Sequence, residues 1–273
     1  MEAKSAVARA KDGCQLSYRI YPNSQKPRVA LIHSLGLAGA MWDQVIARLA
    51  ESAQILVYDC RGHGKSERRP GPYTVELFAE DLAKLFDAVG WSSAVIAGCS
   101  MGGCVAQAFA GKYPERVQGL ALIDTTAWYG PTAPQDWKTR AAKAAEGGLP
   151  SMSDFQLTRW LSDDFRQKHA DIANRTKEIF LANDLPSYQA SCEMLGNADL
   201  REALRKFRVP VSVIVGDADY ATPLAMSQSL HDAIANSTLT ILPGARHLTP
   251  VECPAEITGL IKKLITASMA VSR

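Results

Sequence analysis

Short apolar runs recur along the chain and alternate with longer amphipathic segments. The apolar runs have the length and β-branched content of buried strands, and they predict strands at 15–21, 28–33, 53–58, 93–97, 117–123, 209–215 and 237–242. The segments between them predict helices at 39–50, 75–89, 101–113, 224–235 and 255–267. This alternation predicts an α/β fold, a mostly parallel twisted sheet with helices on both faces, in which ligands bind beyond the carboxyl ends of the strands.

The alternation breaks after the predicted strand that ends at Ile123. From Trp128 to Val209 the pattern is helical, with helices predicted at 133–146, 153–161, 164–181 and 185–194 and no strand. We therefore expect a core made of residues 1–127 and 208–273 and an all-helical cap, or lid, made of residues 128–207. A lid over the strand ends would shape the substrate pocket rather than perform the chemistry.

The turn between one predicted strand and helix carries a serine flanked by small residues. The sequence reads Gly98-Cys99-Ser100-Met101-Gly102, and a strained turn of this kind needs glycine two positions before and two positions after its tip. Ser100 is therefore the candidate nucleophile, with a glycine-rich turn and an incidental serine as the alternative. The Met101 N–H lies at the start of the predicted helix, where it can stabilise an oxyanion.

A serine nucleophile needs a base and an acid, and both follow strands further along the chain. Asp219 comes after the strand at 209–215, and His247 after the strand at 237–242. The order serine, aspartate, histidine makes His247 the expected base and Asp219 the expected acid. Asp217 and Asp124 are alternatives for the acid, and we expect Asp217 to stabilise its loop instead.

The other four histidines are weaker candidates for the base. His33 and His63 lie in glycine-rich loops near the same sheet edge, whereas His169 and His231 fall in predicted helices without an acid or serine partner. The loop that begins at His33 is expected to complete the oxyanion hole through the Leu35 N–H. Ser34 in that loop lacks the flanking glycines of a nucleophile turn.

Residues 59–66 contain an aspartate, a histidine and several glycines, but they lack both further metal ligands and phosphate-loop spacing. We expect an ion pair between Asp59 and Arg61 inside a tight loop. No nucleotide-binding fingerprint occurs, so the sequence predicts neither an organic cofactor nor a metal. The six cysteines show no zinc spacing, and Cys99 and Cys104 are expected to be buried packing thiols rather than reactive groups.

The composition and charge of the chain limit the classes of partner that it is expected to bind. The chain has 273 residues, a formal net charge of +2 and no block of lysine or arginine, which argues against nucleic acid and an anionic membrane and favours a small molecule. Residues 1–5 lack a hydrophobic signal core, and no apolar run approaches the roughly 20 residues that span a bilayer. The expected compartment is the cytoplasm, and no oligomeric state is predicted.

With these residues placed, the chain resembles the α/β-hydrolase superfamily over nearly its full length. The resemblance lies in the serine turn and in three motifs: Asp-x-Arg-Gly-His-Gly-x-Ser at 59–66, Gly-x-x-Asp-x-x-x-Pro at 216–223 and Gly-x-x-His at 244–247. Within the superfamily it looks most like the 3-oxoadipate enol-lactone hydrolases. The matching segments are 33–36, 41–42, 71–74, 137–140, 159–160, 188–193 and 198–201.

This resemblance implies an enzyme that opens a small lactone bearing a carboxylate, through an acyl-enzyme on Ser100. It further implies substrate contacts from Ser34, from Arg140 and Arg159 to the carboxylate, and from Trp137 and Trp160 as pocket walls. The chain departs from the enol-lactonases at Cys99, where leucine is common, and in the turn 219–221, so the rim of the pocket is expected to differ.

Other functions share the same serine, histidine and aspartate. A carboxylesterase of broad specificity and a hydrolase of carbon–carbon or amide bonds need no other catalytic residue. Dehalogenases and epoxide hydrolases that resemble this chain carry an aspartate in place of Ser100, which disfavours them. A receptor that binds its ligand without turnover would be favoured only by the loss of one of these three residues, and all three are present.

Overall fold

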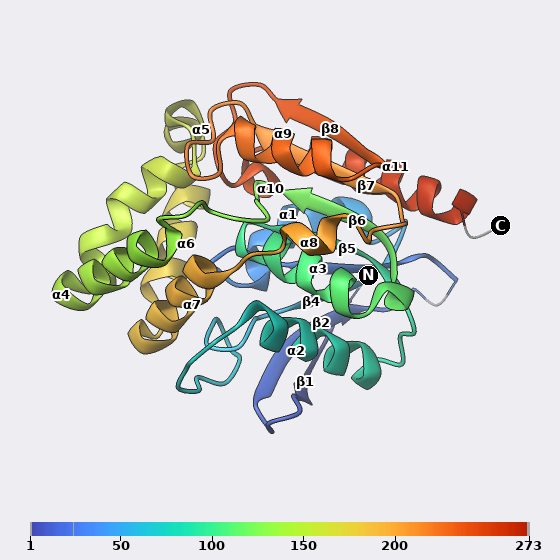
Figure 1. Cartoon of the computed structure of the whole chain (residues 1–273), viewed down its shortest axis with the longest axis horizontal. Coiled ribbons are helices and arrows are strands. Elements are labelled where there is room, and N and C mark those ends of the chain that lie inside the picture. Colours follow the sequence, from blue (N-terminus) through green and yellow to red (C-terminus); the bar gives the residue numbers. More distant parts are fainter. Residues whose placement is uncertain (1, 24, 272–273) are drawn as a thin grey trace.

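A computed structural model describes residues 2–23 and 25–271 (Figure 1). The prediction that residues 1–5 lack a hydrophobic signal core rests partly on Met1, which lies outside these residues. Within the described residues, eight strands form one sheet in the order β1-β2-β4-β3-β5-β6-β7-β8. The strands are β1 (Lys4–Arg9), β2 (Gln15–Tyr21), β3 (Arg28–Ile32), β4 (Gln54–Tyr58), β5 (Ala94–Cys99), β6 (Val117–Ile123), β7 (Val211–Gly216) and β8 (Ser237–Leu242).

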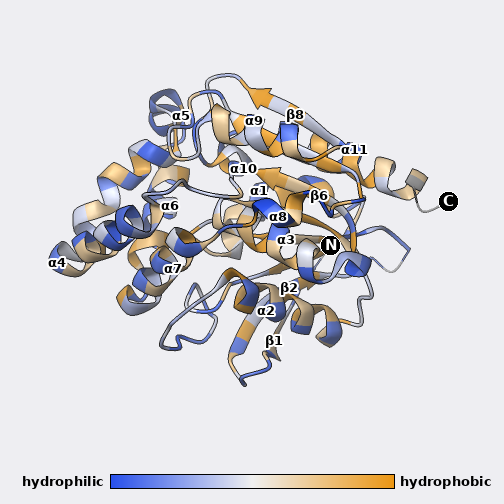
Figure 2. Cartoon of the chain, viewed as in Figure 1, coloured by the Kyte–Doolittle hydropathy of each residue, from blue (hydrophilic) through white to orange (hydrophobic). Residues whose placement is uncertain are grey.

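The predicted α/β fold is confirmed, and each predicted strand is present with a shift of two residues or fewer at either end. β1 pairs with β2, and β2 with β4, in antiparallel fashion, whereas every pair from β4 to β8 is parallel. β5 is buried along its whole length because helices cover both faces of the sheet there. Figure 2 shows the corresponding hydrophobic colouring along β6 and β7.

Helices cover both faces of the sheet. α2 (Val75–Ala88), α3 (Met101–Lys112) and α9 (Leu224–Ala233) lie on one face, and α1 (Asp43–Leu49) and α11 (Pro254–Val271) lie on the other. Shorter turns complete the core: η1 (Gly39–Trp42), η2 (Pro114–Arg116) and α10 (Thr249–Glu252). The predicted helix at 39–50 is thus η1 followed by α1. None of the helices that the structure describes is both long enough and apolar enough to cross a bilayer.

Five helices lie between β6 and β7, and we call them the inserted helices. They are α4 (Ala133–Trp160), α5 (Asp163–Lys168), α6 (Ala170–Leu181), α7 (Leu185–Asn197) and α8 (Arg201–Leu204), and in Figure 1 α4 to α7 stand beyond one end of the sheet. The predicted helices at 133–146 and 153–161 form the single α4, kinked where Gly148 has a φ of 69°. The predicted helix at 164–181 is interrupted at His169.

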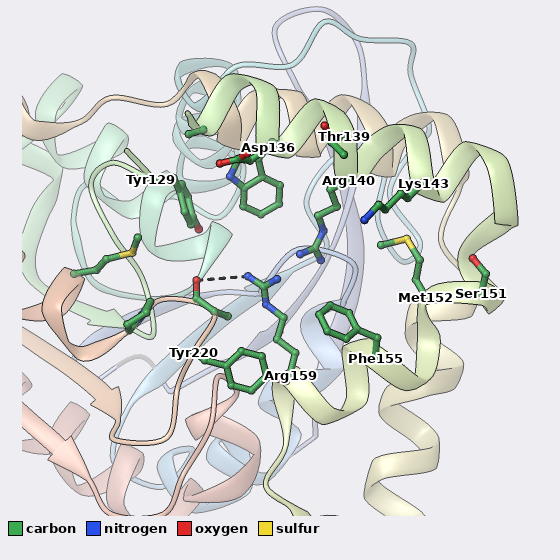
Figure 3. A pocket seen from close by; sticks show the side chains of 15 residues that line it. Tyr129, Asp136, Thr139, Arg140, Lys143, Ser151, Met152, Phe155, Arg159 and Tyr220 are labelled. Carbon is green, nitrogen blue, oxygen red and sulfur yellow. Dashed lines mark hydrogen bonds between the residues drawn. The ribbon is translucent and has the colours of Figure 1, made fainter. Parts of the chain in front are cut away.

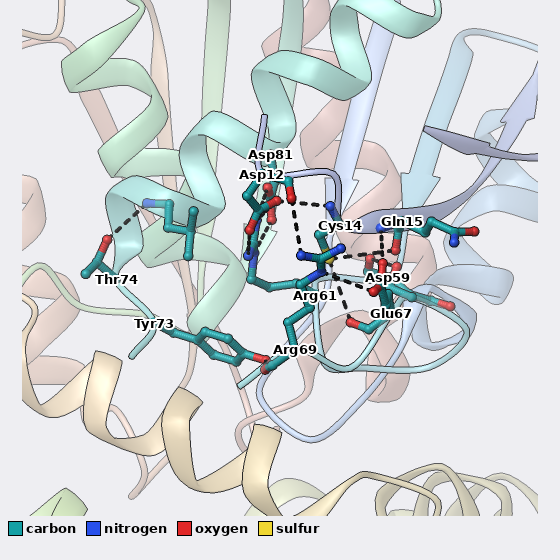
Figure 4. Close-up of polar contacts among 12 residues, drawn as sticks. Asp12, Cys14, Gln15, Asp59, Arg61, Glu67, Arg69, Tyr73, Thr74 and Asp81 are labelled. Atoms are coloured by element: carbon teal, nitrogen blue, oxygen red, sulfur yellow. Dashed lines mark hydrogen bonds and ion pairs between the residues drawn. The ribbon is translucent and has the colours of Figure 1, made fainter. Parts of the chain in front are cut away.

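The expected ion pair between Asp59 and Arg61 is wrong. Arg61 instead donates to Asp81 of α2 at 2.7 and 2.6 Å and to Asp12 at 2.8 Å (Figure 4). Asp59 accepts the backbone N–H groups of Gly39 at 2.7 Å and Lys65 at 2.8 Å. The Arg61 side chain is 2% exposed, so it needs carboxylate partners, and Asp81 and Asp12 supply them while Asp59 accepts backbone N–H groups instead.

Candidate active site

Ser100 sits at a sharp turn between β5 and α3, where its φ is 55° and its ψ is −116°. Two glycines make this turn possible. A Cβ on Gly98 would lie 2.1 Å from the Gly102 carbonyl oxygen, and one on Gly102 would lie 2.3 Å from the Ile32 carbonyl oxygen. The backbone therefore crosses too closely for any side chain at either position, as the sequence predicted.

The Leu35 and Met101 N–H groups are placed by adjacent strands. β3 and β5 pair with Ile32 opposite Gly98, so the loops that follow them start side by side. Within residues 2–23 and 25–271, neither N–H donates to a protein acceptor. His33 orders the first loop, because its Nδ1 donates to the Ser34 carbonyl oxygen and its Nε2 accepts the Cys60 N–H, both at 2.8 Å.

The loops after β7 and β8 bring Asp219 and His247 to Ser100. His247 Nε2 lies 2.9 Å from Ser100 Oγ, and its Nδ1 lies 2.8 Å from Asp219 Oδ2. All three side chains are buried. This geometry matches a tautomer in which Nδ1–H donates to the carboxylate while Nε2 accepts the serine proton.

Hydrogen bonds keep the Asp219 carboxylate charged. Its Oδ1 accepts the N–H groups of Ala221 at 2.7 Å and Thr222 at 3.0 Å, and its Oδ2 accepts the Thr222 hydroxyl at 2.8 Å. Burial would raise the pKa of Asp219, but the charge of His247 and the hydrogen bonds from His247 and Thr222 outweigh it. The pKa therefore lies below its usual range, and the group is ionised near neutral pH.

The two alternative acids have other partners. Asp217 accepts the Gly244 N–H at 2.7 Å and so stabilises its loop, as expected. Asp124 is fully buried and accepts the Thr249 N–H at 2.9 Å, the Thr249 hydroxyl at 2.8 Å and the Gly216 N–H at 3.3 Å. Burial, followed by the charge of Asp219, raises the pKa of Asp124 well above its usual range. Asp124 thus links the loops that carry Asp219 and His247.

The remaining histidines lie in structural contacts. The buried ring of His63 packs against His33 with 5.1 Å between ring centroids. The sequence suggested no serine partner for His231, and the structure places its Nδ1 2.8 Å from Ser237 Oγ. That contact joins the end of α9 to the start of β8, which a helical pattern alone does not reveal.

A small inner cavity contains most of the predicted site residues. It has a volume of about 20 Å³, which leaves room for about one water molecule. Ser100, His247, Ser34 and Leu35 line it from below, and the inserted helices add Trp137, Arg140, Arg159 and Trp160. Sequence reasoning missed Tyr129 and Thr222, which also line it, whereas Ala221 belongs to the turn 219–221 that was expected at the rim of the pocket. Tyr129 follows β6 without any motif that would single it out.

A larger outer chamber of about 750 Å³ shares Tyr129, Trp137, Arg140, Arg159 and Ala221 with the inner cavity. Figure 3 shows the guanidinium groups of Arg140 and Arg159 pointing toward one another in its middle. Among the described residues, no carboxylate forms an ion pair with either arginine. Arg140 Nε donates to the Tyr188 hydroxyl at 2.9 Å, and Arg159 donates weakly to the Ala221 carbonyl oxygen at 3.5 Å.

The two arginines create a positive site. Burial lowers the pKa of Arg159, and the positive charge of Arg140 lowers it further, although both groups stay charged near neutral pH. Arg140 also stacks near Trp137, with 5.1 Å to the ring centroid. A partly buried pair of cations without a carboxylate is suited to bind an anion.

The two cysteines near Ser100 belong to the hydrophobic core. Cys99 and Cys104 are buried, which confirms the expectation of packing thiols, and burial raises the pKa of Cys99 well above its usual range. Across residues 2–23 and 25–271, no group of three or more His, Cys, Asp and Glu side chains is arranged to hold a metal ion.

The strand order, the serine turn and the contacts of His247 together define a protein class. Residues 27–254 match the family model described as the alpha/beta hydrolase fold. The chain belongs to the α/β-hydrolase family, and it is a hydrolase.

Three relatives show which hydrolases within this family the chain is similar to. The chain is 33% identical to 3-oxoadipate enol-lactonase 2 of Acinetobacter baylyi, and the match covers 92% of each chain. The crystal structure of the enol-lactonase from Burkholderia xenovorans LB400 superimposes with a TM-score of 0.91 at 32% identity, covering 96% of this chain and 100% of that one. A thermophilic esterase from Thermogutta terrifontis, solved with malate bound, gives a TM-score of 0.89 at 26% identity, covering 98% and 99%.

Proposed function

We propose that this protein is a serine hydrolase that opens a small carboxylate-bearing lactone similar to 3-oxoadipate enol-lactone. The observation that carries the proposal is a single arrangement. Ser100 and His247, which is hydrogen-bonded to Asp219, line a cavity that is also lined by two arginines without an ion pair to a described carboxylate. The first part supplies acyl-transfer chemistry, and the second selects an anionic substrate.

Ser100 is the proposed nucleophile. His247 Nε2 removes its proton as Oγ attacks the lactone carbonyl, and the Leu35 and Met101 N–H groups stabilise the oxyanion. When the intermediate collapses, the bond between the carbonyl carbon and the ring oxygen breaks, and the ring oxygen takes the proton from His247. Water, deprotonated by His247, then attacks the acyl-enzyme and releases the open-chain acid with Ser100 restored.

Asp219 keeps His247 in the required tautomer throughout this cycle. The four hydrogen bonds that Asp219 accepts fix its carboxylate before substrate arrives. The imidazolium that forms during attack therefore meets a preformed negative charge, which stabilises the transition state.

Residues 128–207 form the proposed lid and determine which substrate binds. Tyr188 is 1% exposed and holds Arg140 through its Nε, so the two terminal nitrogens of Arg140 remain for a substrate carboxylate. Arg159 is the proposed second contact, Trp137 and Trp160 are the proposed walls, and Ser34 is the proposed polar contact beside the oxyanion hole. Because the inner cavity holds about one water, substrate entry requires side chains on this boundary to move.

The relatives support an acidic substrate. Two of them are named enol-lactonases, and the esterase from Thermogutta terrifontis was solved with malate, a dicarboxylate. The catalytic residues would equally serve a carboxylesterase of broad specificity, so the test must compare a charged lactone with a neutral ester. We also propose the cytoplasm as the compartment, which the free thiol state of the six cysteines supports.

The test measures hydrolysis of freshly generated 3-oxoadipate enol-lactone and of p-nitrophenyl acetate by the wild type and Ser100→Ala. We expect fast lactone opening, slower ester hydrolysis, and loss of both in Ser100→Ala, whose single-atom change leaves the turn intact. Activity on the neutral ester alone would favour the carboxylesterase. Lactone opening that survives in Ser100→Ala would contradict the assigned nucleophile.

A further inference from the structure

The outer chamber is much larger than a small lactone needs, and its lining is unlike the inner cavity. Its volume of about 750 Å³ lies in the range of pockets that enclose drug-sized ligands, about 300–1,000 Å³. Six of its fifteen lining residues carry aromatic or thioether side chains, and these are Tyr129, Trp137, Met152, Phe155, Tyr220 and Met226. Polar and charged groups also line it, among them Asp136, Thr139, Lys143 and Ser151 on α4 beside the two arginines.

Two of these apolar side chains remain exposed to solvent. Phe155 is 57% exposed and Tyr220 is 49% exposed, and Figure 3 shows both beside the Arg159 side chain. They come from α4 and from the loop after β7, two segments that both line this chamber. Large apolar groups gathered around a concavity indicate a binding surface, because apolar groups scattered over the surface would not line one cavity.

The arginines connect this chamber to the catalytic residues. Arg140 and Arg159 line both the inner cavity, which contains Ser100, and the outer chamber. A carboxylate held between them therefore lies at the boundary. The carbon that bears this carboxylate can extend one substituent toward Ser100 and a second substituent into the chamber.

We propose that the outer chamber binds an apolar substituent, preferably aromatic, on the carbon next to the substrate carboxylate. The inference rests on the proposed function, because it uses the carboxylate site that is proposed there. Under this inference the substrate is a lactone or ester of a substituted carboxylic acid. Such a substrate is larger than an unsubstituted six-carbon lactone. If the chamber were only an entry passage for a small polar lactone, it would need no aromatic lining.

Calorimetric titration of the wild type with succinate and with 2-benzylsuccinate tests this inference without requiring turnover. Both diacids carry the carboxylate, and only the second carries an aromatic group on the adjacent carbon. We expect 2-benzylsuccinate to bind about tenfold more tightly, because the chamber removes its ring from water. Phe155→Ala should remove most of that advantage and leave the Kd of succinate unchanged.

Two further variants sharpen the result. Thr139→Trp places a large side chain on the chamber wall and should also reduce binding of 2-benzylsuccinate but not of succinate. Met269→Ala truncates a comparably exposed side chain, 51% exposed, on α11 and should change neither Kd. Thermal unfolding of each variant checks that it is folded.

The outcomes separate this inference from the proposed function. Equal affinities for the two diacids, or a benzyl advantage that survives in both Phe155→Ala and Thr139→Trp, would overturn the chamber assignment and leave the arginine site standing. If neither diacid binds the wild type, the carboxylate site itself is wrong, and the chamber inference is overturned with it.

Discussion

The loops at the sheet end and the inserted helices differ in how fully their polar groups are paired. At the sheet end, Asp219 accepts four hydrogen bonds and His247 has a partner at each ring nitrogen. In the inserted helices, Arg140 and Arg159 are partly buried without an ion pair to any described residue, and Phe155 is exposed. We propose that the first region is complete before substrate arrives, whereas the second is completed by the substrate that it binds.

This difference assigns separate tasks to the two regions. Changes at the sheet end should lower turnover on every substrate, because they alter the reacting groups. Changes in the inserted helices should alter the preference between substrates, because they alter binding of parts remote from the reacting carbonyl. Each prediction below tests one side of this separation.

The largest expected effect is at Asp219. Asp219→Asn should lower kcat by about 10⁴-fold on both the lactone and p-nitrophenyl acetate, since the amide favours the wrong histidine tautomer. Asp217→Asn is the matched control, because Asp217 lies two residues away and accepts the Gly244 N–H in its loop. Steady-state kinetics measure both. Equal losses in the two variants would contradict the assignment of the acid.

The next effect is at Arg140. Arg140→Met should lower kcat/KM for the carboxylate lactone by about 100-fold through a loss of charge-assisted hydrogen bonds, and leave p-nitrophenyl acetate hydrolysis near the wild-type rate. Lys138→Met, an exposed change on the same helix, controls for net charge. A parallel loss on both substrates would mean that Arg140 acts on the catalytic residues instead.

A change at Arg61 tests the stability of the fold separately from catalysis and from substrate choice. Arg61→Met leaves the buried Asp81 carboxylate without its partner and should lower the free energy of unfolding by about 3–5 kcal/mol. Arg69→Met, which breaks a solvent-exposed pair with Glu67, should cost less than about 1 kcal/mol. Urea unfolding compares them. We expect kcat of folded Arg61→Met to remain close to wild type, and a large loss would tie this cluster to catalysis.

The smallest effect concerns acid stability. The hydrogen bond from Arg61 lowers the pKa of Asp12, so this group stabilises the fold above its unfolded pKa, about 3.9, and the contribution is lost as pH falls through the lowered folded value. Unfolding free energy should therefore fall less steeply below about pH 4 in Asp12→Asn than in the wild type. In an Arg61→Met background the difference between the two slopes should shrink, because only the Cys14 N–H and the charge of Arg69 then lower the pKa of Asp12. An undiminished difference there would contradict Arg61 as the main cause.

Local patterns predicted the sheet well because β3 to β7 are buried and apolar along almost their whole length. The strand missed, β1, has five exposed positions and one buried position, so neither alternation nor an apolar run marks it. It exists because it pairs with β2, a tertiary contact. By contrast, the helical pattern located both halves of α4, since the predicted helices at 133–146 and 153–161 lie on either side of Gly148, whose backbone is not helical.

Motifs predicted the catalytic contacts better than the pocket. Gly98, Ser100 and Gly102 form one local turn, so their spacing is informative by itself. The hydrogen bond between Arg140 and Tyr188 joins residues 48 positions apart, and the Arg61 contact with Asp81 joins residues 20 positions apart. Only the folded chain brings such partners together, which is why the expected pair of Asp59 and Arg61 was wrong.

The central claim is that the sheet end performs the chemistry while the inserted helices choose the substrate. Its most direct test is the ratio of kcat/KM for 3-oxoadipate enol-lactone to that for p-nitrophenyl acetate, measured in the wild type and in Arg140→Met/Arg159→Met. We predict that the double variant lowers this ratio by at least about 100-fold through the lactone alone. An unchanged ratio, with both activities reduced together or both retained, would contradict the account.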